Sequence, residues 1–131
     1  MNNEKLLRIS LKANVIFSIL SGLAALFLGT SSQAVLEMAS GNGIAFGLQL
    51  LIFGAFVFYN ATRSRVSQIM IYIIILLDII YFLGVFARLW VEDISYGGSV
   101  LMIFTGLIVG ILALLQFIGL RKAIDLKKIS N

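Results

Sequence analysis

The chain has 131 residues, of which 60% are hydrophobic and 12% are charged, and its formal net charge is +4. Soluble domains average roughly 45–50% apolar and about 25% charged residues, so this composition excludes an ordinary water-soluble fold. Cysteine and histidine are both absent, which excludes thiolate chemistry and removes the commonest general base and metal ligand. We therefore expect an integral membrane protein with one domain, 1–131, no cofactor and no metal site.

Four apolar runs follow one another along the chain, at about residues 13–29, 43–60, 66–89 and 99–120. Each is near or above the length needed to cross about 30 Å of hydrocarbon as a helix. In lipid the backbone must pair with itself, and runs without the alternation of a barrel strand favour helices. The predicted fold is all-α: a polytopic transmembrane four-helix bundle in up-down-up-down order.

The links between these runs carry interfacial residues. The link 30–42 contains an apolar stretch, 34–39, that suits one or two helical turns at the membrane surface. The link 90–98 contains Trp90 and Tyr96, which are typical of the aromatic belt, beside Glu92 and Asp93.

The basic residues set the orientation of the spans. Arg88 alone precedes the link 90–98, and the other nine flank the opposite ends of the spans: Lys5, Arg8, Lys12, Arg63, Arg65, Arg121, Lys122, Lys127 and Lys128. Because cytoplasmic loops carry the Lys and Arg excess, both termini are expected in the cytoplasm, with the chain in a bacterial-type cytoplasmic (inner) membrane. Residues 5–34 also fit a signal peptide, but the apolar run is at or above the upper length for one, which favours a retained helix.

Small residues at helical spacing predict close helix packing. Ser18 and Gly22 share a face of the first span, Gly54 lies in the second, and Gly106 and Gly110 share a face of the fourth. Such faces let backbones approach closely, which drives helix association in lipid. We expect these contacts within the bundle, with the Gly106–Gly110 face as the alternative seam between copies.

Asp78 is the one charged residue deep within a span. It lies 12 residues from both Val66 and Trp90, which places it near the bilayer midplane, about 18 Å from either end at 1.5 Å per residue. Insertion of an acid at a helix centre costs about 2.5–3.5 kcal/mol, and such an acid indicates a functional site by default.

Other polar residues form layers around this depth. Ser21 lies at the level of Asp78, and Tyr81 lies one turn further along the same helix. Gln49 and Thr105 form a layer toward the outside, and a third layer toward the cytoplasm holds Asn14, Gln68 and Gln116. We expect a proton or ligand site at Asp78, with Tyr81, Ser21 and Gln49 around it.

Two functions fit this pattern. The sequence favours a structural or accessory bundle, in which a protonated Asp78 bonds to Ser21, Tyr81 or a backbone carbonyl and fixes helix register. The alternative is a small proton-coupled transporter or cation-binding carrier that uses Asp78 in a cavity. We expect no enzymatic activity, because a second acid, an activated nucleophile and a metal site are all missing from the spans.

The expected partners are the lipid bilayer and either further copies of the chain or a larger membrane complex. Nucleic acid is not expected, because the basic residues sit at helix ends, where they face lipid headgroups.

The chain resembles small bacterial four-helix integral membrane proteins of uncharacterised function. The positions that carry the resemblance are Asn14, Phe17, Ser18, Ser21, Gly22, Gly54, Asp78, Gly84 and Gln116. The resemblance implies the four-span topology and no substrate. The layout, though no specific motif, is also similar to DoxX-type proteins. Small multidrug resistance transporters share the helix count and one buried acid, but theirs is a glutamate of the first span, where this chain has no acid.

Overall fold

The computed structural model is all-helical and describes residues 4–130, with side chains described as far as residue 124. The helices, in chain order, are α1 Lys5–Leu28, α2 Gln33–Met38, α3 Gly43–Thr62, α4 Gln68–Val91 and α5 Tyr96–Ser130. Within the described residues, the four long helices are each long and apolar enough to cross a membrane. The predicted all-α class is therefore confirmed, and so is the short helix in the link after the first span.

The long helices extend beyond the apolar runs that predicted them. α1 begins at Lys5, eight residues before the predicted start at 13, because Leu7 and Leu11 continue its buried face at a spacing of four. α5 begins at Tyr96 and continues to Ser130. The side chains of Lys127 and Lys128, which contributed to the predicted orientation, lie outside the described residues.

Local polar residues fix where the helices begin. The side chain of Ser32 accepts a hydrogen bond from the Val35 N–H at the start of α2, and Asn42 does the same for Ala45 at the start of α3. These caps satisfy N–H groups that have no partner within the helix. Between the two helices, Ser40 and Gly41 have φ values of 57° and 85°, in the left-handed region that commonly ends a helix.

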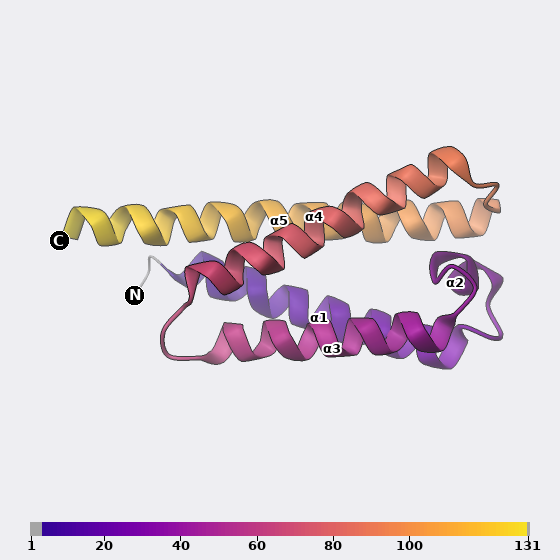
Figure 1. Cartoon of the computed structure of the whole chain (residues 1–131), viewed down its shortest axis with the longest axis horizontal. Coiled ribbons are helices and arrows are strands. Elements are labelled where there is room, and N and C mark those ends of the chain that lie inside the picture. The colour runs from indigo at the N-terminus through magenta and orange to yellow at the C-terminus, as the bar shows by residue number, and fades with distance from the viewer. Residues whose placement is uncertain (1–3, 131) are drawn as a thin grey trace.

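The helices form two antiparallel pairs, and successive long helices run in opposite directions (Figure 1). α1 packs along α3, α4 packs along α5, and contacts between α1 and α5 join the two pairs. α3 and α4 make few contacts, and α4 diverges from α3 toward the end of the bundle that holds α2 (Figure 1). Both termini lie at the opposite end (Figure 1).

Near the termini, the bundle is filled with apolar side chains. We call this set the apolar cluster, and its buried members are Leu7, Leu11, Val57, Ala61, Ile71, Ile74, Ile75, Ala113 and Leu120. Gly119 lets α5 approach α1 closely here: a Cβ at this position would lie 2.7 Å from the backbone nitrogen of Leu7. This end of the molecule is therefore closed.

The small residues named from the sequence lie at helix contacts within the chain. A Cβ added to Gly22 of α1 would lie 3.0 Å from the carbonyl oxygen of Gly47 in α3, and one added to Gly54 would lie 2.7 Å from the Ile19 side chain. A Cβ added to Gly106 or Gly110 of α5 would lie 3.2 Å from the ring of Phe86 or 2.8 Å from the ring of Phe82, both in α4. The four glycines thus bring helices of one chain together.

Candidate functional site

Asp78 is held in a buried network of polar side chains from three helices. The amide of Asn14 in α1 donates to Oδ2 of Asp78 at 2.9 Å, and the amide of Gln116 in α5 donates to the same oxygen at 2.8 Å. Asn14 also donates to Oε1 of Gln116 at 2.9 Å and accepts a hydrogen bond from the Ser18 hydroxyl. All four side chains are at most 3% exposed, so these bonds form away from solvent and are stronger than they would be in water.

The partners of Asp78 differ from those expected. The sequence predicted a bond to Ser21, Tyr81 or a backbone carbonyl and assigned Asn14 and Gln116 to a separate layer. That assignment assumed a first span that begins near residue 13, whereas α1 begins at Lys5. Asn14 is thus the tenth residue of α1 and Asp78 the eleventh of α4. Since the two helices run in the same direction, these residues lie at the same depth.

Tyr81 belongs to a second polar group, toward α2. Its hydroxyl lies 3.3 Å from the Thr105 hydroxyl of α5, and Thr105 in turn contacts the sulfur of Met38 in α2 at 3.8 Å. The ring of Tyr81 also lies beside that of Phe46, with 6.4 Å between ring centroids. Tyr81 is offset from Asp78 by about 60° around the helix, which directs it to this group and away from the carboxyl.

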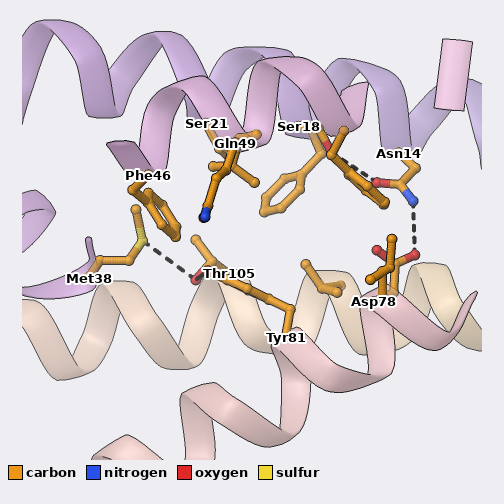
Figure 2. A pocket seen from close by; sticks show the side chains of 14 residues that line it. Asn14, Ser18, Ser21, Met38, Phe46, Gln49, Asp78, Tyr81 and Thr105 are labelled. Atoms are coloured by element: carbon orange, nitrogen blue, oxygen red, sulfur yellow. Dashed lines mark hydrogen bonds between the residues drawn. The ribbon is translucent and has the colours of Figure 1, made fainter. Parts of the chain in front are cut away.

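Between the two polar groups lies a cavity of about 260 Å³, which we call the central cavity. It separates the α1–α3 pair from the α4–α5 pair (Figure 2). Its lining comprises Asn14, Phe17, Ser18, Ser21, Met38, Phe46, Gln49, Leu50, Phe53, Leu77, Asp78, Tyr81, Thr105 and Val109. The four residues proposed from the sequence as a site, Asp78, Tyr81, Ser21 and Gln49, all line this one cavity.

The two oxygens of the Asp78 carboxyl have different surroundings. Oδ2 accepts both amide hydrogen bonds. Among the described residues, Oδ1 has no hydrogen-bond partner, and it lies on the side of the carboxyl that faces the cavity (Figure 2). A carboxyl group in this arrangement can donate from Oδ1 when it is protonated, or accept a cation there when it is ionised.

The lining of the cavity reaches the protein surface at α3 and α4. Gln49 of α3 and Leu77 of α4 both line it, yet both side chains are exposed at the protein surface, Leu77 by 43%. They flank the gap where α3 and α4 make few contacts. The opening therefore faces the side of the bundle, where a membrane would present its acyl chains.

At the end away from the termini, hydrogen bonds from Arg88 and Ser95 hold α2 against the bundle. The Arg88 guanidinium donates to the carbonyl oxygens of Glu37 and Met38, at 2.6 and 3.0 Å, and pairs with Glu92. The hydroxyl and N–H of Ser95 donate to the Glu37 carboxylate. These two hydrogen bonds lower the pKa of Glu37 below its usual value of 4.5. Met38 is thereby held over the end of the central cavity that lies farther from the termini.

The chemistry available in the cavity is binding and proton exchange. Asp78 and Tyr81 are the titratable side chains of the lining, and no Lys or Arg belongs to it. The described residues contain no group of three or more acidic side chains arranged to hold a metal ion.

No protein-family model matches the chain, and no curated protein or solved structure matches it.

Proposed function

We propose that the protein is a small multi-pass carrier of the cytoplasmic membrane, in which Asp78 binds a proton or a cation inside the central cavity. The observation that carries this proposal is the asymmetry of the Asp78 carboxyl. One oxygen accepts hydrogen bonds from two amides, while the other faces the cavity and has no hydrogen-bond partner among the described residues (Figure 2). An acid kept at that depth costs insertion energy, which a working site would justify.

The orientation within the membrane follows from charge. Lys5 and Arg8 lie in the first turns of α1, and Arg63 and Arg65 follow the end of α3; both of these helix ends lie at the end of the bundle that holds the termini (Figure 1). Arg88 lies in the last turn of α4, at the other end. Under the positive-inside rule, both termini face the cytoplasm and the four long helices cross the bilayer up, down, up and down. The central cavity then lies within the hydrocarbon layer.

A cavity supports the carrier over a purely structural bundle. Protein interiors are normally close-packed, because side chains that line a void lose dispersion contacts. A bundle that needed Asp78 only to fix helix register would gain from larger side chains at Ser21 or Val109. A cavity of about 260 Å³ beside the acid is instead the property that a ligand site requires.

The second candidate is the structural or accessory bundle. The observation that favours it is the closed network of Asn14, Asp78 and Gln116, which ties α1, α4 and α5 together. Buried polar networks of this kind can specify one register of packing. In this alternative the protein acts by assembly with a larger membrane complex or with copies of itself.

Transport in sealed vesicles distinguishes the two candidates. Purified protein is reconstituted with a pH gradient and an internal pH dye, and sodium, potassium or tetramethylammonium is added outside. The carrier predicts that at least one of these cations collapses the gradient with native protein and not with Asp78→Asn. If none has an effect, or if the variant transports equally well, the carrier function is wrong.

A further inference from the structure

We infer that the central cavity takes a compact aromatic or aliphatic ammonium cation, and that this cation reaches it sideways from the lipid, through the gap between α3 and α4. The inference rests on the proposed function and names the ligand class and route for the same site. It follows from three observations: the charge of the lining, its aromatic content and the position of the opening.

The charge of the lining selects a cation. Asp78 is the one lining residue that can carry a full negative charge at neutral pH, and no basic side chain compensates it. Tyr81, the other titratable group of the lining, is neutral unless its phenol ionises. An anion would therefore meet repulsion from Asp78 and find no positive partner. A cation finds one carboxyl oxygen that has no hydrogen-bond partner in the part of the chain that the structure describes.

The walls of the cavity suit an organic cation better than a metal ion. Phe17, Phe46, Phe53 and Tyr81 supply aromatic rings around a single acidic group. Aromatic faces attract ammonium groups and bind their methyl groups by dispersion. A hard metal ion would need several oxygen ligands in place of these rings. The volume of about 260 Å³ lies just below the roughly 300–1,000 Å³ typical of ligand pockets, so the ligand must be compact.

The route is defined by what closes the other sides. Between α1 and α3, the backbones are in contact at Gly22 and Gly47. The apolar cluster fills the bundle toward the termini, and Met38 of α2, which is 6% exposed, covers the opposite end. The lining residues with exposed side chains are Gln49 and Leu77, and they lie at the edges of the gap between α3 and α4. An amphiphilic cation already dissolved in the bilayer can pass this gap without crossing a layer of protein.

Binding of a permanent cation exchanges one positive charge for another at Asp78. The proton leaves the carboxyl for water, and the carboxylate that remains pairs with the ammonium group. The net charge of the cavity stays the same, so neither state leaves an unpaired charge in lipid. Protons and cations therefore compete, and binding weakens as the pH falls.

Benzyltrimethylammonium is the probe that tests this inference, with benzenesulfonate as a matched anion. Protein in lipid nanodiscs is mixed with each probe, and released protons are followed in time with a pH dye. We expect native protein to bind the cation and release protons, and the anion to have no effect. Asp78→Asn should bind the cation at least about tenfold more weakly, because a lost buried charge pair costs more than one decade of affinity.

The lateral route is tested with a pair of neighbouring substitutions on α4. Leu77→Trp narrows the gap and should slow proton release about tenfold, a change of about 1.4 kcal/mol in the barrier. Leu76 is exposed on the same helix but does not line the cavity, so Leu76→Trp should leave the rate unchanged. Leu77→Ala, which widens the gap, should speed release and shows that position 77 tolerates change.

The outcomes separate this inference from the proposed function. Equal slowing by both tryptophan variants would overturn the lateral route, and equal binding of the anion would overturn the ligand class. If sodium or potassium collapses the vesicle gradient but benzyltrimethylammonium does not bind, the carrier stands and the inference fails. If neither cation experiment responds to Asp78→Asn, both fail.

Discussion

The same four long helices pack differently in the two halves of the bundle. Toward the termini, the apolar cluster closes the interior, and Gly119 brings α5 against the backbone of α1. Toward α2, the helix pairs separate around a cavity with polar and aromatic walls. The network at Asp78, Asn14 and Gln116 lies at the boundary between the two halves.

The two halves therefore differ in what they contribute to stability and to function. The closed half contributes tight contacts between backbones and fully buried side chains, which stabilise the bundle. The half with the cavity keeps close backbone contacts within the α1–α3 pair, at Gly22 and Gly47, but gives up contacts between the two helix pairs and places an acid beside the cavity. Substitutions in the two halves should therefore differ in kind: those in the first alter folding, and those around the cavity alter ligand or proton binding.

The largest expected loss of stability comes from Gly119→Ala in the closed half. The added Cβ would lie 2.7 and 2.8 Å from backbone atoms of Leu7, which cannot move aside as a flexible side chain can. We expect a loss of about 2–3 kcal/mol in the free energy of unfolding in mixed micelles. Gly84 is the control, because a Cβ there meets nothing within 4 Å. A loss at Gly84→Ala as large as at Gly119→Ala would contradict the described packing.

A smaller loss is expected at the boundary network. Asn14→Ala removes three hydrogen bonds, each worth about 0.6 kcal/mol in membrane proteins, for a total of about 2 kcal/mol. Gln68→Ala is the matched control, because Gln68 is exposed and makes no side-chain hydrogen bond among the described residues. Equal unfolding free energies for the two variants would mean that the network contributes nothing to stability.

The smallest expected effect is a pH dependence of α2. The hydrogen bonds from Ser95 lower the pKa of Glu37 below its usual value of 4.5. The stabilisation of α2 by these hydrogen bonds is therefore fully present above pH 4.5 and is lost as the pH falls through the lower pKa of the folded state. Amide hydrogen exchange in α2 should accelerate at acid pH. Glu37→Gln should abolish that dependence, whereas Asp93→Asn should retain it; retention in Glu37→Gln would contradict this assignment.

Much of the fold was predictable because lipid allows few backbone arrangements. Four apolar runs without strand alternation predict four long helices, and the structure has them. The residue at which the first helix begins was less predictable, because Leu7 and Leu11 continue its buried face among charged residues. Because of that one wrong boundary, the predicted depth of Asn14 differed from the depth of Asp78 by about two helical turns.

The candidate site was predictable in part. Depth along the helices groups Asp78, Ser21, Tyr81 and Gln49, and these side chains do line one cavity. Periodicity does not give the angle at which helices cross, so it could not show that α4 diverges from α3 and leaves the gap at Leu77. The contacts of Arg88 with α2 were also beyond prediction, since they join segments 50 residues apart through backbone carbonyls.

Proton exchange at Asp78 can be followed by infrared spectroscopy of its carboxyl group in lipid. Native protein and Asp78→Asn are compared across pH. We expect a carboxylic acid band that is missing in the variant and that disappears reversibly in native protein as the pH is raised through the neutral range. A band that stays unchanged across that range, with the variant folded normally, would contradict the carrier and leave Asp78 as a structural acid of an accessory bundle.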